Sequence, residues 1–354
     1  AVTTVTATDV DLDTLSYSIS GGADAALFSV DPNTGVLTFD SAPNFEAPAD
    51  ADTNNVYEVT VQASDGNGGT DTQAISVTVT EVLELVVTNT NSTGTGSLYE
   101  AILNANANSG VTDTITFNSP GAGPHVINLT TALPAITDSV IIDGTTEPDY
   151  AGDPIIQLNG SALGAGVNGL TFTSTSDGSE VRGLMITGFS QHGIQINSGA
   201  DGITIANNWI GTTGTGSVGD GNGNTGIYIQ GANTVVGGTG ANDGNVITNN
   251  GNEGINVTGA GATGTIIQGN IIGLDPDGAS GAGNTDVGIA LLSGANNTTI
   301  GGSTAGARNI ISNNFEGIEI NSNNNTVQGN YIGTDITGTL GRGNRSDDGI
   351  ELQN

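Results

Sequence analysis

The chain has 354 residues, which exceeds the usual length of one domain and predicts either two domains or one elongated repeat. Its 36 acidic residues outnumber its 4 basic ones, all of them arginine, and give a formal net charge of -32. So few cationic side chains cannot neutralise a polyphosphate backbone, which excludes binding of nucleic acid. The net negative charge also opposes docking on an anionic membrane. No apolar run is long enough to insert into a bilayer, and zero cysteines exclude disulfides and thiolate sites.

Residues 1–83 are predicted to form a β-sandwich. Strand patterns occur at Leu15–Ser20, Leu27–Val30, Gly35–Phe39, Val56–Ala63 and Ala74–Thr80. Apolar and polar residues alternate along 56–63, as a half-buried strand requires. Turn-forming sequences such as 65–69 separate the patterns. Several short strands within about eighty residues are typical of a sandwich.

Acidic residues in this segment suggest a cation site. Asp9, Asp11 and Asp13 alternate in a segment that we expect to be extended, so that their carboxylates point to one side. Like charges repel unless a hard cation lies among them, and Ca²⁺ is bound by six to eight oxygen atoms. Asp65 ends a later strand, and Glu46 lies in a loop. A solvated acidic loop would explain the same residues, and composition does not separate the two interpretations.

The segment resembles a bacterial cadherin-type repeat. The resemblance rests on Asp9-Val10-Asp11, Leu27-Phe28-Ser29-Val30-Asp31, Phe45-Glu46, Val56-Tyr57-Glu58-Val59-Thr60-Val61 and Ala63-Ser64-Asp65-Gly66. It implies that Asp9, Asp11 and Asp65 bind Ca²⁺ at the junction with a preceding repeat, and that Glu46 serves the opposite junction. The residues after Glu81 lack the asparagine of the family's linker, and no preceding repeat is present. We therefore expect a half-formed site that binds Ca²⁺ weakly.

Residues 84–354 are predicted to form a right-handed parallel β-helix. The sequence Asn208-Trp209-Ile210-Gly211 recurs in similar form at 270–273 and 330–333, and a Gly-Ile pair opens a short strand six times. Such short strands are stable only when each coil stacks on the next and buries a continuous apolar column. Asparagine and glycine suit the corners, and stacked asparagines can form hydrogen-bonded ladders. A propeller or a leucine-rich horseshoe would need longer strands or helical segments.

One helix is predicted at about 97–107. Ser97 and Glu100 have the spacing of a capping box, and Leu98, Ala101, Ile102 and Ala105 share one face. We expect this helix to cover the apolar end of the first coil rather than to serve as an ordinary connection. The sequences at 140–146 and 329–335 resemble the β-helix regions of large bacterial surface and secreted proteins. That resemblance is specific for architecture but uninformative about function.

Parallel β-helices are common among polysaccharide lyases, hydrolases and epimerases, so an enzyme has to be considered. A lyase would need Arg or Lys as base, and a surface of this charge would repel polyuronates.

The outward positions of the Gly-Ile strands are Gln195, Tyr228, Asn256, Ala290, Glu319 and Glu351. Glu319 and Glu351, one coil apart, approach the separation of a hydrolase pair. In so acidic a chain we expect them to be surface carboxylates, and we expect no enzyme. His125 and His192 have no evident partner and are interpreted as ordinary strand or corner residues.

The sequence predicts an extracellular structural or adhesive module of a secreted or cell-surface bacterial protein, rigidified by Ca²⁺. Glycans would bind along the solenoid face through Gln195, Tyr228 and Asn256. One alternative is a glycoside hydrolase that uses Glu319 and Glu351, and another is a subunit of a self-assembling filament. The chain ends directly after a strand pattern, so we expect it to continue or to stack on another copy. Expected partners are neighbouring modules, further copies of the chain and glycans.

Overall fold

The computed structural model describes residues 2–43, 45, 48–79, 85–214, 219–346 and 348–353. The chain forms two compact units, Ala1–Val82 and Leu83–Asn354. Within the described ranges, no helix combines the length and the apolar character needed to cross a bilayer.

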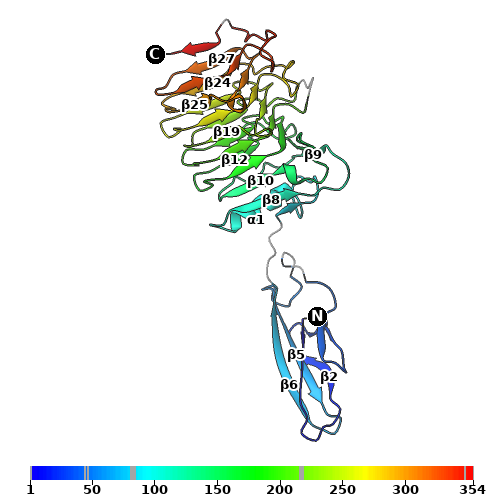
Figure 1. Ribbon diagram of the computed structural model, residues 1–354. Helices are drawn as coiled ribbons and strands as arrows, with labels where there is room; N and C mark the ends of the chain where they lie inside the picture. The colour runs from blue at the N-terminus through cyan, green and yellow to red at the C-terminus, as the bar shows by residue number, and fades with distance from the viewer. Residues whose placement is uncertain are drawn as a thin grey trace. The chain divides into compact units, whose positions relative to one another are not determined.

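The N-terminal unit contains two three-stranded antiparallel sheets within its described residues (Figure 1). One sheet has the order β1 (Thr3–Thr4), β4 (Val36–Phe39) and β3 (Phe28–Val30), and the other β2 (Ser16–Gly21), β5 (Val56–Ser64) and β6 (Thr70–Thr78), with the 3-10 helix η1 at Ala25–Leu27. The predicted strands are present, although β6 begins at Thr70 rather than at Ala74. The alternation in β5 buries Tyr57, Val59 and Val61 between the sheets.

The segment from Asp9 to Asp13 is not extended, so the prediction of three aligned carboxylates is wrong. Asp9 Oδ1 accepts hydrogen bonds from the backbone N–H groups of Asp11 (2.8 Å) and Asp13 (3.1 Å). Leu12 has a φ of 65°, in the left-handed region. A short carboxylate side chain that bonds to the backbone two residues on forms a turn, and this turn replaces the expected strand.

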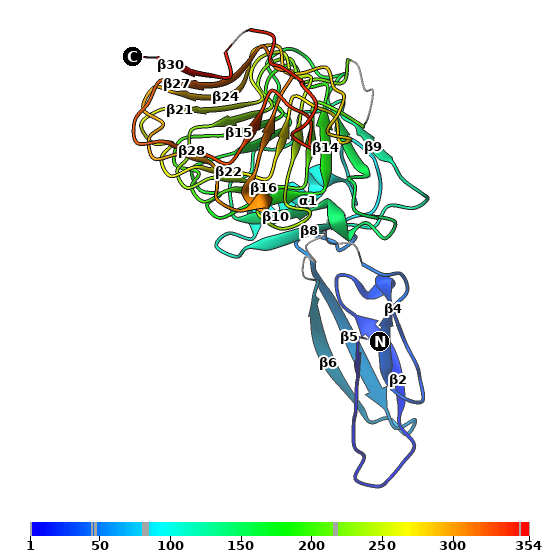
Figure 2. The same ribbon diagram turned by 45° about the horizontal axis from the view of Figure 1, so that its top comes forward.

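The C-terminal unit is a parallel β-helix built from three long parallel sheets, whose coils stack from the cyan to the red end of the chain (Figure 1 and Figure 2). The nine-stranded sheet consists of β7 (Val86–Val87), β8 (Asp113–Phe117), β10 (Val140–Asp143), β13 (Glu180–Arg182), β16 (Thr204–Ala206), β19 (Val235–Gly237), β22 (Ile266–Gln268), β25 (Thr299–Gly301) and β28 (Thr326–Gln328). The eight-stranded sheet consists of β9 (His125–Asn128), β11 (Ile156–Asn159), β14 (Leu184–Thr187), β17 (Trp209–Ile210), β20 (Val246–Ile247), β23 (Ile271–Ile272), β26 (Ile310–Ile311) and β29 (Tyr331–Ile332). The seven-stranded sheet consists of β12 (Leu170–Phe172), β15 (Ile194–Ile196), β18 (Ile227–Ile229), β21 (Ile255–Thr258), β24 (Val287–Leu292), β27 (Glu316–Ile320) and β30 (Ile350–Leu352). Two 3-10 helices, η2 (Gly144–Thr146) and η3 (Ala305–Ala307), lie at corners.

The predicted helix is α1 (Leu98–Ala107), which packs at the first coil of the β-helix. Ser97 Oγ accepts a hydrogen bond of 3.2 Å from the backbone N–H of Glu100 and caps the helix. Leu98 and Ile102 are fully buried in the same apolar cluster as the strands of the coils. Burial of two such side chains contributes about 1.5–3 kcal/mol each. The helix therefore covers the apolar end of the column, as the sequence predicts.

Two ladders of asparagines, buried except at their last rungs, hold the coils in register. In the first ladder, the side-chain amide nitrogen of each asparagine, or rung, donates to the amide oxygen of the asparagine in the next coil at 2.9–3.2 Å. The rungs follow in the order Asn208, Asn245, Asn270, Asn309 and Asn330. In the other the distances are 2.8–3.4 Å, in the order Asn222, Asn250, Asn284, Asn314 and Asn344. The same amide nitrogens also donate to strand carbonyls, as Asn270 does to Val236 O at 2.9 Å. The ladders therefore link each coil to the next through side-chain amides as well as through backbone hydrogen bonds.

The corner between the two ladders alternates between a long and a short form. Consecutive rungs are 14 residues apart at 208 to 222, 270 to 284 and 330 to 344, but only 5 apart at 245 to 250 and 309 to 314. Because long and short corners alternate, two coils form one repeat of about sixty residues, and similar sequences recur at 208–211, 270–273 and 330–333. The long corners therefore occur in every second coil, on the same edge of the β-helix.

Candidate functional site

The outward side chains of the seven-stranded sheet form a row, which we call the polar face. Successive strands pair in register at Gln195, Tyr228, Asn256, Ala290, Glu319 and Glu351. Neighbouring strands lie about 4.8 Å apart, so each of these side chains stands beside the next. Glu319 and Glu351 lie one coil apart, as the sequence predicts, whereas Asn256 and Ala290 are buried although they were predicted to face outward.

An aromatic and amide cluster occupies one end of the polar face. The rings of His192 and Tyr228 are stacked, with 4.6 Å between centroids and 17° between planes. Asn168 Nδ2 donates to Gln195 Oε1 at 2.5 Å, and Gln195 Nε2 donates to Asn197 Oδ1 at 2.7 Å. Each of these side chains is half-buried, so its orientation is fixed while one side remains accessible. His192 therefore has a partner, contrary to the interpretation of it as an ordinary corner residue.

A buried glutamate lies in the middle of the polar face. Glu253 is 8% exposed, and its carboxylate accepts hydrogen bonds from Thr225 Oγ1 (2.7 Å) and Asn256 Nδ2 (3.0 Å). Asn256 is 7% exposed, and its amide oxygen is buried without a hydrogen bond. The amide group of Asn256 is thus largely committed to Glu253, and it is less accessible than its outward position suggests.

The other end of the polar face is acidic. Burial raises the pKa values of Glu316 and Glu319, and the neighbouring negative charge of Glu351 raises both further. Burial and the charge of Glu253 raise the pKa of Asp286 in the same way. A raised pKa favours the protonated form of these carboxyl groups relative to a solvent-exposed one.

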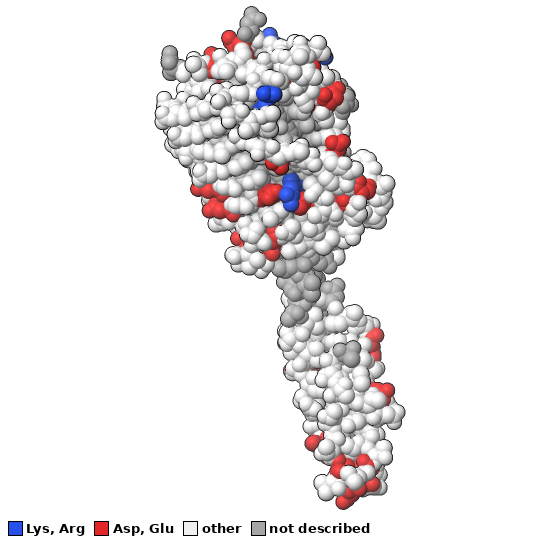
Figure 3. Space-filling view, viewed as in Figure 1, with Lys and Arg blue, Asp and Glu red and all other residues white. Residues whose placement is uncertain are grey.

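Three of the predicted Ca²⁺ ligands, Asp9, Asp11 and Asp65, lie in two loops of the N-terminal unit. Acidic side chains gather at one end of this unit (Figure 3). Asp65 Oδ1 accepts hydrogen bonds from the N–H groups of Asn67 (2.8 Å) and Gly69 (2.9 Å), and the first of these holds the pKa of Asp65 below its usual value. Asn67 Nδ2 donates to Asp13 Oδ2 at 2.9 Å and joins the two loops.

This exposed set of ionised oxygens fits the chemistry of Ca²⁺. Among the described residues, however, Asp9, Asp11 and Asp65 do not form a group with ligand atoms within 4.8 Å of one another. Glu46 lies outside the described residues. The assignment of these four residues to Ca²⁺ therefore stays a prediction.

Comparison with known proteins agrees with this architecture. Residues 1–83 match the family described as Cadherin domain. A solved structure of the periplasmic alginate epimerase AlgG, a T265N mutant, is similar to the chain with 20% sequence identity and a TM-score of 0.36. The similarity covers 48% of this chain and 33% of the epimerase chain. No curated protein matches the sequence.

The chain thus joins a cadherin domain to a parallel β-helix, as the sequence predicts. The cadherin match supports a module that functions outside the cytoplasm. The expectation that the chain is not an enzyme is corrected, because a solved structure similar to the chain is that of an alginate epimerase. At this level of similarity the comparison assigns no activity to the chain, and the chemistry has to be argued from its own residues.

Proposed function

We propose that the chain is an extracellular carbohydrate-binding module whose β-helix binds a glycan along the polar face. The observation that carries this proposal is the in-register row from Gln195 to Glu351, with the His192–Tyr228 ring stack at one end. A tyrosine ring offers an apolar surface with a polar edge, which suits the face and the hydroxyls of a sugar. Amide and carboxylate groups beside it can donate to and accept from sugar hydroxyls.

The charge of the chain restricts the class of glycan. With a net charge of -32 and four arginines, it repels polyuronates and sulfated chains. Arg182 is already paired with Asp143 (2.7 Å) and Glu180 (3.2 Å), so it offers little to an acidic sugar. Neutral or amino-sugar polymers are therefore the proposed ligands.

Affinity electrophoresis in gels that contain a neutral polysaccharide or chitosan tests the proposal. Tyr228→Ala should abolish the retardation shown by the wild-type chain, and Tyr228→Phe should retain most of it. Tyr331→Ala is the matched control, because Tyr331 lies in β29 on another sheet, where Arg308 stacks on its ring at 4.1 Å. Equal retardation of wild type and Tyr228→Ala would contradict a binding role for the polar face.

Hydrolysis of the bound glycan is a second candidate function, favoured by the raised pKa values of Glu316 and Glu319. Glu316 or Glu319 would donate a proton to the glycosidic oxygen, and Glu351 would act as nucleophile or activate water. Release of reducing ends that is lost in Glu319→Gln and Glu351→Gln, but kept in Glu180→Gln, would support hydrolysis. Glycan binding without release of reducing ends would contradict hydrolysis and support a function in binding alone.

The N-terminal unit is proposed to bind Ca²⁺ through Asp9, Asp11 and Asp65, with Glu46 serving a second junction. The match to the cadherin domain supports this, together with the exposed oxygen ligands of the two joined loops. Bound Ca²⁺ would stiffen the junction with a neighbouring module, and an adhesive role would follow from a stiff rod with a glycan-binding face.

A further inference from the structure

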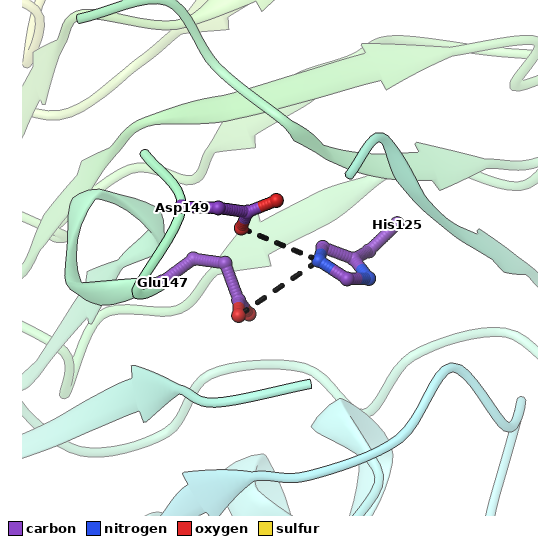
Figure 4. A group of neighbouring side chains, drawn as sticks. All are labelled: His125, Glu147 and Asp149. Carbon is purple, nitrogen blue, oxygen red and sulfur yellow. Dashed lines mark ion pairs between the residues drawn. The ribbon is translucent and has the colours of Figure 1, made fainter. Parts of the chain in front are cut away.

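Three potential metal ligands come together in the first coils of the β-helix (Figure 4). His125 is the first residue of β9, Glu147 directly follows η2, and Asp149 lies two residues further on. One ligand atom from each residue lies within 4.8 Å of the other two. Among the described residues, this is the one group of three or more His, Asp or Glu side chains that meets this criterion.

Both carboxylates are held in place by the backbone. The N–H of Ser119 donates to both carboxylate oxygens of Glu147, at 3.1 and 3.0 Å. The N–H of Gly123 donates to Asp149 Oδ2, and this bond holds the pKa of Asp149 below its usual value. The other oxygen of Asp149 faces the imidazole (Figure 4). Hydrogen bonds of this kind orient the ligands of metal sites.

The distances suit an ion between the groups better than a direct hydrogen bond. Nε2 of His125 is buried and makes no hydrogen bond. It lies 3.5 Å from Asp149 Oδ1 and 3.8 Å from Glu147 Oε1, beyond the about 2.7–2.9 Å of a charge-assisted hydrogen bond. Metal–ligand bonds of about 2.0–2.2 Å at tetrahedral angles place neighbouring ligand atoms about 3.3–3.6 Å apart.

The charge of the cluster also calls for a cation. His125 is 6% exposed and the side chain of Glu147 is 1% exposed, so a carboxylate is buried with little access to water. Among the described residues, no arginine forms an ion pair with Glu147 or Asp149. A buried carboxylate without a full positive partner is unfavourable, and a divalent ion would compensate both negative charges.

We propose that His125, Glu147 and Asp149 bind one divalent transition-metal ion of the Zn²⁺ class. An imidazole ligand favours such ions over Ca²⁺ and Mg²⁺, and the chain has no thiolate that would select softer ions. Asp149 is 37% exposed, which provides an entry path and room for a water ligand. The ion joins β9 to the turn after β10, so that it clamps the first two coils together.

Isothermal titration of the full chain with ZnCl₂, after treatment with EDTA and in the presence of excess CaCl₂, tests the proposal. The calcium saturates oxygen-only sites, so that the remaining heat reports a nitrogen-containing site. The wild-type chain should bind one Zn²⁺ and unfold at a higher temperature when loaded. His125→Gln and Asp149→Asn should each weaken binding at least about tenfold. His192→Gln is the matched control, because the chain contains two histidines, and it should bind as the wild type does.

Absence of Zn²⁺ binding by the wild type, or unchanged affinity in Asp149→Asn, would overturn the proposal. Circular dichroism checks the fold of each variant. Asp149 is the most exposed ligand, so Asp149→Asn remains informative even if His125→Gln fails to fold.

Discussion

His192 and Tyr228 lie in successive coils of the β-helix, and their rings stack with centroids 4.6 Å apart. Burial lowers the pKa of His192, although the negative charge of Glu253 acts in the opposite direction. Folding therefore favours the neutral imidazole, which packs on the tyrosine ring without a charge to solvate. The stack is consequently a pH-sensitive part of the proposed glycan-binding surface.

The wild-type chain should lose stability below about pH 6.5 for this reason, because the unfolded chain takes up a proton there that folded His192 resists. The contribution is fully present above the unfolded pKa and is lost as the pH falls toward the folded one. Urea unfolding at pH 7 and pH 5.5, followed by circular dichroism, should show a larger loss for wild type than for His192→Gln. Equal losses in the two proteins would argue against a buried neutral imidazole.

Replacement of Glu319 should have the opposite dependence on pH. Its pKa is raised by burial and by Glu351, so that ionisation is unfavourable in the folded chain. The contribution of Glu319 to the stability of the wild type is therefore most favourable below the unfolded pKa of about 4.3, and it falls as the pH rises through the folded value. Glu319→Gln should raise the unfolding temperature at pH 7 and have little effect at pH 4.

Glu180→Gln provides the contrast for that experiment, because Glu180 is 3.2 Å from Arg182 in an ion pair. This replacement should be neutral or slightly destabilising at pH 7, by about 0–1 kcal/mol. A stabilisation of the same size in both variants would show that general charge reduction, and not the acidic cluster, is responsible.

Removal of a central ladder rung should be costly. Asn270 is fully buried, donates to Asn309 and to two backbone carbonyls, and accepts from Asn245. Asn270→Ala leaves several buried polar groups unpaired, each worth about 1–3 kcal/mol, so a loss of at least about 3 kcal/mol in the free energy of unfolding is expected. Chemical denaturation measures it, and Asn323→Ala, at an exposed corner, should change stability by less than about 0.5 kcal/mol.

Calcium should stabilise the N-terminal unit if its two acidic loops bind the ion. Chelation with EGTA should lower the temperature of the transition that belongs to residues 1–82, and Asp9→Asn should make this transition insensitive to calcium. Asp40→Asn serves as control, because Asp40 accepts a hydrogen bond from Ser29 Oγ and is no predicted ligand. Scanning calorimetry with and without CaCl₂ separates these outcomes, and an unchanged transition in the wild type would remove Asp9 from consideration as a ligand.

The β-helix was predictable because its determinants are local and repeated. The Gly-Ile pairs mark the strands of one sheet, and the asparagines that precede strands such as β17 and β23 are the ladder rungs. The capping box of α1 was predictable for the same reason, since Ser97 and Glu100 interact within one turn. Short-range spacing carries this information directly in the sequence.

The functional clusters were less predictable because they depend on how different coils meet. His125 starts a strand of the eight-stranded sheet, whereas Glu147 follows a strand of the nine-stranded sheet, and no repeat relates the two. The turn at Asp9 depends on a side-chain bond to the backbone that competes with an extended conformation. The register of Glu319 and Glu351 was predictable, but the raised pKa values depend on burial that only the folded coils create.

The alternation of long and short corners has a consequence for how such a chain can diversify. The long corners begin after β17, β23 and β29 and end directly before the rungs Asn222, Asn284 and Asn344, and the coils above and below set the positions of these strands and rungs. Two of them also contact each other, since the N–H of Ile336 donates to the carbonyl of Gly278 at 2.9 Å. Length and sequence can therefore change there without shifting a strand, which makes this edge a natural place for grafted peptides and for variation among related chains.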